Sequence, residues 1–185
     1  MRQNENVYMS NDNYAAIDCG TNSTRLLIGN ELETLDRQMR ITRLGQDVDK
    51  TAELSDEAMS RVLDVLGDFH KRFEIYGVSK VRVVATSAAR DASNKDDFFN
   101  EVESIIGVKP DLLTGQEEGR LAFAGAIAEL KPSEGPFLVV DIGGGSTEFV
   151  FGSQEAENVH SCQIGCVRLT EEFVENDPPL PEELH

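Results

Sequence analysis

The stretch FLVVDIGGGSTEFVFG, residues 137–152, places three consecutive glycines between two runs of β-type residues. A second stretch of equal length, YAAIDCGTNSTRLLIG at residues 14–29, aligns with it without a gap. The alignment matches an acidic residue, a glycine and a Ser-Thr dipeptide in the two stretches: Asp18 with Asp141, Gly20 with Gly143, Ser23 with Ser146 and Thr24 with Thr147. The chain therefore contains the same sequence motif twice.

Each copy predicts a β-hairpin whose Gly-rich turn binds an anion. Glycine permits positive φ and lets the backbone approach a ligand closely. Successive backbone N–H groups in such a turn can surround a phosphate group. We expect the two turns to enclose a phosphoanhydride between them. The predicted phosphate-binding residues are Gly20, Thr21, Asn22, Ser23, Arg25, Gly143, Gly144, Gly145 and Ser146.

Acidic residues beside the turns predict a divalent cation. A carboxylate repels phosphate directly, but it can hold a cation or a cation-bound water next to the phosphate. The two copies differ where Arg25 aligns with Glu148. The first turn therefore has a basic side chain at this position, and the second turn has an additional acidic one. The predicted ligands of Mg²⁺, or of another divalent cation, are Asp18, Asp141 and Glu148.

The turns allow two other interpretations. A dinucleotide-binding turn needs a helix after its glycines, whereas TEFVFG at 147–152 has the composition of a strand. This interpretation is therefore rejected. A pair of ordinary hairpins without a ligand stays open, although a gapless duplication disfavours it.

Composition limits the classes of partner. A net charge of −17 argues against nucleic-acid binding, because acidic residues outnumber the basic residues that would contact phosphate groups. No apolar run has the length of a membrane span, and the polar N-terminus lacks the apolar region of a signal peptide. Three cysteines without dense spacing fit a reduced compartment. We expect a cytoplasmic protein with no nucleic-acid or membrane partner.

The remaining sequence alternates strand-like and helix-like segments, which predicts an α/β fold. Apolar residues at helical spacing predict helices over 54–73 and 95–106, with Ser55 and Asn94 as N-caps. A third helix is expected over 114–130.

The expected organisation has three parts. These are a flexible tail at 1–13, a first domain at 14–131 and the incomplete beginning of a second domain at 132–185. The second domain is expected to be incomplete because its last stretch, 170–185, is typical only of a helix start and a loop.

The duplicated hairpin resembles that of the actin, heat-shock-70 and sugar-kinase superfamily. Five segments in order are similar to the exopolyphosphatase and guanosine pentaphosphate phosphohydrolase family: 15–29, VVATSAARDASN at 83–94, LLTGQEEGRLAFAGA at 112–126, 139–152 and QIGCVRLTE at 163–171. The resemblance implies an actin-like, ribonuclease H-like α/β fold. It would have mixed five-stranded sheets flanked by helices, in two domains around a cleft, with the second domain truncated.

The resemblance also implies roles for two charged residues. Glu118, the glutamate immediately before a Gly-Arg pair, corresponds to the family's catalytic base, and Arg90 corresponds to its phosphate-binding arginine. The residues alone leave Glu118 open as a solvated glutamate in the first turn of a helix, favoured by the helix dipole. Its neighbour Glu117 stands at capping-box spacing from Thr114, which predicts a structural role.

The activity that the resemblance implies is Mg²⁺-dependent hydrolytic release of terminal orthophosphate from inorganic polyphosphate. Hydrolysis of guanosine pentaphosphate is the alternative within the family, because the motifs are shared. A non-catalytic phosphate- or nucleotide-binding regulator is the alternative from another class. Family members are commonly dimers, so a homodimer is also expected.

Overall fold

The computed structural model describes residues 12–184, and its strands form two sheets. The first sheet is mixed and five-stranded, in the order β3-β2-β1-β4-β5, and the second is three-stranded and antiparallel, in the order β6-β7-β8. The strands are β1 Asn13–Cys19, β2 Ser23–Gly29, β3 Thr34–Ile41, β4 Val78–Ala85, β5 Asp111–Leu112, β6 Phe137–Ile142, β7 Thr147–Gly152 and β8 Ala156–Cys162.

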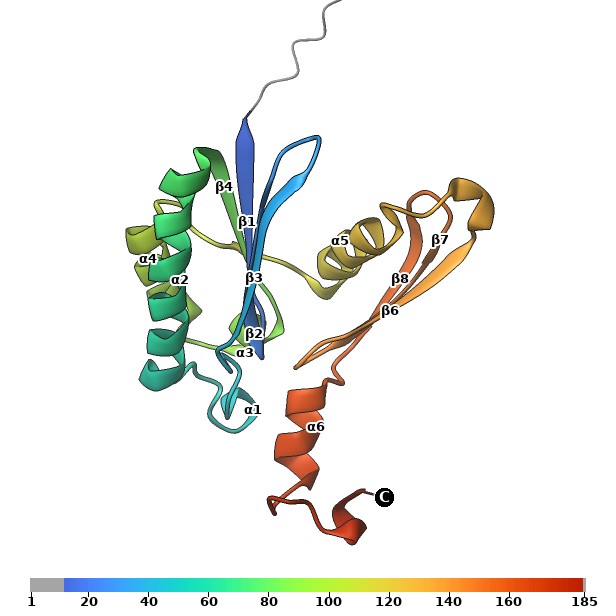
Figure 1. Cartoon of the computed structure of the whole chain (residues 1–185). Helices are drawn as coiled ribbons and strands as arrows, with labels where there is room; N and C mark the ends of the chain where they lie inside the picture. Colours follow the sequence, from blue (N-terminus) through green and yellow to red (C-terminus); the bar gives the residue numbers. More distant parts are fainter. Residues whose placement is uncertain (1–11, 185) are drawn as a thin grey trace, which may run out of the picture.

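Helices cover both sheets. They are α1 Val48–Thr51, α2 Asp56–Tyr76, α3 Ser87–Asp91, α4 Lys95–Ile106, α5 Gly115–Ile127 and α6 Cys166–Phe173, with 3-10 turns at Pro132–Glu134 and Pro181–Leu184. Figure 1 shows α2 and α4 on one side of the first sheet, and α5 on its other side, against the second sheet. We call 13–112 the first lobe and 115–162 the second lobe.

The first lobe contains the main hydrophobic core, between its sheet and α2 and α4. Helix α2 begins as predicted, because the Ser55 side chain accepts a hydrogen bond from the Ala58 N–H, and it ends at Gly77, whose φ is +59°. Its apolar stripe is buried: Met59, Val62, Leu66, Phe69 and Phe73. Helical spacing in the sequence therefore identified the buried face correctly.

The start of α4 corrects one prediction. Asn94 stands at the N-cap position but makes no side-chain capping bond. Its amide instead pairs with the backbone of Leu54, accepting from the N–H and donating to the carbonyl, both at 2.8 Å. Asn94 thus ties the segment before α2 to the start of α4, a role that depends on residues far away in the sequence.

Helix α5 packs on one face of the second sheet. A Cβ on Gly119 would lie 2.8 Å from Val159 Cγ1 and 3.1 Å from Val150 Cγ2, so glycine permits the close approach of helix and sheet. The opposite face of the sheet exposes large apolar side chains: Leu138, Val140, Ile142, Phe149 and Phe151.

The expected division into domains stays a prediction. A boundary after residue 131 would separate α5 from the sheet that it covers. The expected tail at 1–13 lies outside the described residues except for its last two, and Asn13 already begins β1. Among residues 12–184, the structure has no helix that is both long and apolar enough to cross a membrane.

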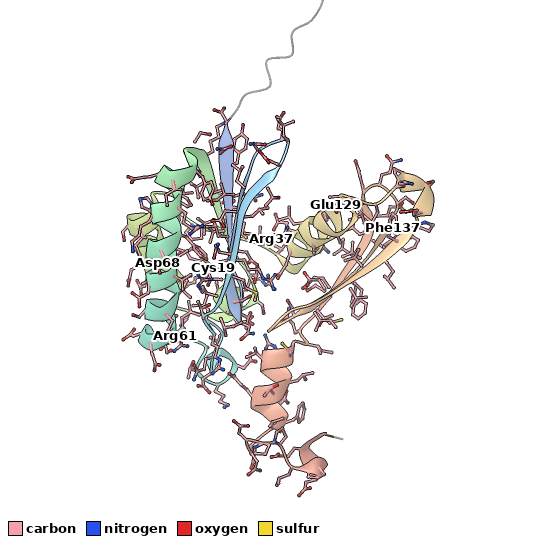
Figure 2. The ribbon with its side chains drawn as sticks, viewed as in Figure 1. Cys19, Arg37, Arg61, Asp68, Glu129 and Phe137 are labelled. Atoms are coloured by element: carbon pink, nitrogen blue, oxygen red, sulfur yellow. The ribbon has the colours of Figure 1, made fainter. Side chains whose placement is uncertain are left out.

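Cys19 ends β1 and belongs to the core of the first lobe (Figure 2). Only 1% of its surface is exposed. Burial, and to a lesser degree the neighbouring charge of Asp18, raises the pKa of its thiol. Cys19 is therefore a packing residue held in the neutral thiol form.

Candidate active site

The duplicated sequence motif forms a structural repeat. In the first turn, residues 20–23, the Gly20 N–H donates to the Ser23 carbonyl at 3.1 Å; in the second turn, residues 143–146, the Gly143 N–H donates to the Ser146 carbonyl at 2.9 Å. The flanking strands pair in the same register, because the aspartate before each turn lies opposite the residue two places after its serine. The gapless alignment therefore predicted two equivalent hairpins correctly.

The expectation of positive φ in the second turn is wrong. Within the described residues, the glycines with positive φ are Gly77 and Gly107, which end helices. A Cβ on Gly144 would lie 2.9 Å from Thr21 Cβ, and one on Gly145 would lie 3.0 Å from the Cβ of Ser87. Glycine is required here because the second turn packs tightly against the first turn and the start of α3.

The two turns meet where Gly144 packs against Thr21, and together they line a cleft of about 350 Å³. Most of the residues predicted to bind phosphate or metal line this cleft: Asp18, Gly20, Thr21, Asn22, Ser23, Arg25, Asp141, Gly143, Gly144, Gly145 and Ser146. Glu118 lies on the wall with them, together with Leu121 and Ala122 of α5. The sites predicted from segments far apart in the chain are thus brought together.

Arg90 contacts this wall from the first lobe. Its Nη1 donates to Glu118 Oε2 and to the Leu113 carbonyl, each at 2.8 Å, and its Nη2 lies 3.4 Å from Ser146 Oγ. The side chains of Arg90 and Glu118 are only 16% and 20% exposed. Arg90 therefore joins the first lobe to α5 and to the second turn.

Glu118 has the environment of a proton acceptor. Burial raises the pKa of its carboxyl group, the Arg90 hydrogen bond and charge oppose this, and the charges of Glu148 and Asp18 raise it further. The net result is a pKa above the ordinary value of 4.5. A glutamate that is largely buried, paired with an arginine and open to a cleft is suited to accept a proton from water.

Glu117 has the opposite environment. It is exposed and completes a capping box with Thr114, as predicted: it accepts from the Thr114 N–H at 2.8 Å, and the Thr114 hydroxyl accepts from its N–H at 3.2 Å. The Thr114 backbone and side-chain hydrogen bonds lower the pKa of its carboxyl group. Two adjacent glutamates thus differ in chemistry because only one faces the cleft.

The predicted metal ligands divide into two groups. Asp18 and Asp141 both line the cleft, and burial raises the pKa of Asp18, opposed by Arg25 and increased by Asp141. Glu148 is buried behind them, 1% exposed, and accepts from the Ser161 hydroxyl at 2.8 Å. No cluster of three or more His, Cys, Asp or Glu residues with metal-binding geometry is found within 12–184.

This donor set nevertheless suits Mg²⁺. Mg²⁺ prefers oxygen ligands and is commonly held by one or two carboxylates together with substrate phosphates and water. Asp18 and Asp141 offer two carboxylates in the lining of a cleft whose turns suit phosphate. The residues that are present therefore fit a divalent cation that binds together with its substrate.

Sequence reasoning missed Ser87 as a functional candidate. Ser87 is the first residue of α3, separated from β4 by Thr86; it lines the cleft and is 2% exposed. Its hydroxyl is the one buried side-chain N or O atom without a hydrogen-bond partner among the described residues. The available signal was a polar residue just beyond the carboxyl end of a predicted strand, three residues before the matched Arg90.

Comparisons with known proteins agree with this geometry. The model of the Ppx/GppA phosphatase family matches residues 17–185. Exopolyphosphatase 2 of Mycobacterium tuberculosis is 45% identical over 183 residues, which cover 92% of this chain and 57% of that protein. Guanosine-5′-triphosphate,3′-diphosphate pyrophosphatase of Photobacterium profundum is 38% identical, over 86% of this chain and 33% of that protein.

Solved structures support the same fold. The crystal structure of the Aquifex aeolicus member of the Ppx/GppA family has a TM-score of 0.75 and 38% identity, over 94% of this chain and 58% of that one. MreB5 of Spiroplasma citri, at 16% identity and a TM-score of 0.50, shares the fold alone, over 88% of this chain and 55% of that one. The predicted actin-like α/β fold is thereby confirmed. The chain spans less than two thirds of the curated relatives' length.

Proposed function

Because the chain belongs to the Ppx/GppA phosphatase family, we propose that it hydrolyses phosphoanhydrides, releasing terminal orthophosphate from inorganic polyphosphate. The observation that carries the proposal is the cleft that two equivalent Gly-rich turns line together with Glu118. A linear phosphate chain has acceptor oxygens on every side, so backbone donors from two turns suit it.

Glu118 is proposed as the base that accepts the proton of the attacking water. Arg90 holds its Oε2 atom at 2.8 Å, so we assign the Oε1 atom to the water. The raised pKa makes this carboxylate a stronger base than an exposed glutamate. Arg90, predicted to bind phosphate, is assigned here to orienting Glu118 and Ser146.

The turns are proposed to bind and orient the terminal phosphate. Ser23 and Ser146 contribute hydroxyl groups, and Arg25, which is largely exposed at the cleft, contributes positive charge. Asp18 and Asp141 would hold a divalent cation, which neutralises charge on the phosphate oxygens when it is bound. Glu148, which is buried against Ser161, is assigned to supporting these ligands from behind rather than to direct contact.

Guanosine pentaphosphate is the second candidate substrate, because the Photobacterium profundum relative is a guanosine-5′-triphosphate,3′-diphosphate pyrophosphatase. Both substrates would present the same terminal phosphate to the two turns. A non-catalytic regulator fits less well, because a binding protein has no need of a buried carboxylate with a raised pKa. Cytoplasmic location, a homodimer and the division into two domains stay predictions.

The deciding experiment measures orthophosphate release from polyphosphate, guanosine pentaphosphate and ATP side by side, with Mg²⁺. The enzyme is kept in excess over substrate, so that slow turnover is still visible. Release from polyphosphate that exceeds release from ATP supports the proposal. Tight binding of polyphosphate without any release supports the regulator, and release only from guanosine pentaphosphate supports the second candidate.

A further inference from the structure

The start of α6 holds the carbonyl groups of the second turn. The Cys166 N–H donates to the Gly143 carbonyl at 3.0 Å, and the Arg168 N–H donates to the Gly144 carbonyl at 3.1 Å. The Arg168 side chain continues the row, because its Nε donates to the Gly145 carbonyl at 2.9 Å. The first N–H groups of a helix lack partners within the helix, so the helix start and the turn satisfy each other.

These bonds determine the direction of the N–H groups in the turn. In a planar trans peptide, the carbonyl of one residue and the N–H of the next point in opposite directions. Three consecutive carbonyls held by α6 therefore turn the N–H groups of Gly144, Gly145 and Ser146 away from α6. All three residues line the cleft. The row of N–H groups is thereby oriented for an anion.

The other end of Arg168 reaches the first lobe. Its Nη1 pairs with Asp49 of α1, and its Nη2 donates to Asp91 Oδ2 of α3 at 2.7 Å. The side chain is 22% exposed. Helix α3 also carries Arg90, which holds Glu118. One guanidinium group thus connects the second turn to the helix that positions the proposed base.

We propose that Arg168 is a positioning residue, which orients the second turn toward phosphate and keeps it in register with the first lobe. The inference rests on the proposed function, because it assumes that the turn binds phosphate. Three acceptors in different directions require the planar fork of arginine, since a lysine ammonium cannot reach all three from one stem. Neither the internal repeat nor the assigned site includes this residue.

The test uses amide NMR spectra of the chain, titrated with inorganic tripolyphosphate and Mg²⁺. In the parent chain, the amide signals of Gly144, Gly145 and Ser146 are expected to shift on binding. Arg168→Ala should weaken the affinity for tripolyphosphate about tenfold, the equivalent of one hydrogen bond to a charged group. Arg168→Lys should not restore it, which distinguishes the fork from simple positive charge.

Glu171→Ala is the matched control. Glu171 also joins α6 to the first lobe, because its carboxylate accepts from the Asp47 N–H at 3.2 Å, but it has no bond to the second turn. If α6 acted only as a structural link, Glu171→Ala would weaken binding as much as Arg168→Ala. We expect its affinity to stay within twofold of the parent.

If Arg168→Ala does not fold, the Asp49→Asn/Asp91→Asn double variant replaces it, because it leaves every contact with the turn in place. It should weaken binding about threefold, since the far end of Arg168 loses the charges of its two ion-pair partners. Parent-like affinity in a folded Arg168→Ala chain, or in the double variant when that chain does not fold, overturns the inference and leaves the proposed function standing. A parent chain that binds no tripolyphosphate overturns both.

Discussion

Glu118→Gln separates chemistry from binding at the proposed active site. The amide keeps the shape of the side chain but cannot accept a proton from water. Loss of a positioned base typically costs 10²–10⁴-fold in rate, so turnover should fall at least ~100-fold, or about 2.7 kcal/mol of transition-state stabilisation. Tripolyphosphate affinity should stay within a few-fold, because the turns that we assign to phosphate are unchanged.

The sign of the pH dependence follows from the raised pKa of Glu118. The ionised form is the active base, so hydrolysis should fall as pH is lowered through a midpoint above the ordinary 4.5. A carboxyl group with a higher pKa in the folded than in the unfolded chain binds protons more tightly when folded. It therefore contributes stability at low pH that is lost as pH rises from 4.5 through its folded pKa. Glu118→Gln should consequently gain stability relative to the parent between pH 4 and pH 7.

The matched control is Glu117→Gln, one residue earlier on the same helix. Glutamine also serves at this position of a capping box, so turnover should stay within about twofold of the parent. Phosphate release is measured at enzyme excess from pH 4 to 8, and stability is measured by urea unfolding over the same range. Near-parent turnover in a folded Glu118→Gln chain, or an equal loss in Glu117→Gln, would refute the assignment of the base.

Four further changes test other parts of the site and fold. Asp141→Asn should raise the Mg²⁺ concentration needed for half-maximal phosphate release, and an activation curve identical to that of the parent would contradict the metal role. Gly144→Ala should weaken tripolyphosphate binding, because its Cβ would lie 2.9 Å from Thr21 Cβ; isothermal titration of a folded variant checks this. Ser87→Ala should leave the melting temperature unchanged, because its hydroxyl has no partner within 12–184, but should raise KM for polyphosphate. Gly67→Ala, inside α2 with nothing within 4 Å of the new Cβ, should stabilise the chain by about 0.5–1 kcal/mol, and a loss of stability in urea unfolding would contradict the space seen there.

Much of the site could be predicted from the sequence because its parts are local. Each Gly-rich turn joins two strands that are neighbours in the chain, so strand composition and spacing were sufficient to predict both hairpins. The capping box at Thr114 was equally predictable, because its bonds span three residues. The identity of the base required the family resemblance, since periodicity alone left Glu118 open as a solvated glutamate.

The predictions that failed concern contacts between distant segments. The sequence suggested a helix cap at Asn94, but its side chain binds Leu54, forty residues earlier. It suggested positive φ in the second turn, whereas Gly144 is needed because Thr21 of the other turn lies against it. In both cases the residue type was informative, but the reason for it was a partner that local pattern does not reveal.

The sequence by itself determined that the chain has two equivalent Gly-rich hairpins in an α/β fold, because turn chemistry and strand alternation act between neighbours along the chain. Only the tertiary structure decided that the two turns line one cleft, that Arg90 holds Glu118, and that Arg168 spans both lobes. These arrangements depend on how sheets and helices pack. Packing brings together side chains whose separation in sequence, 28 residues for Arg90 and Glu118 and 77 for Arg168 and Asp91, carries no local signal.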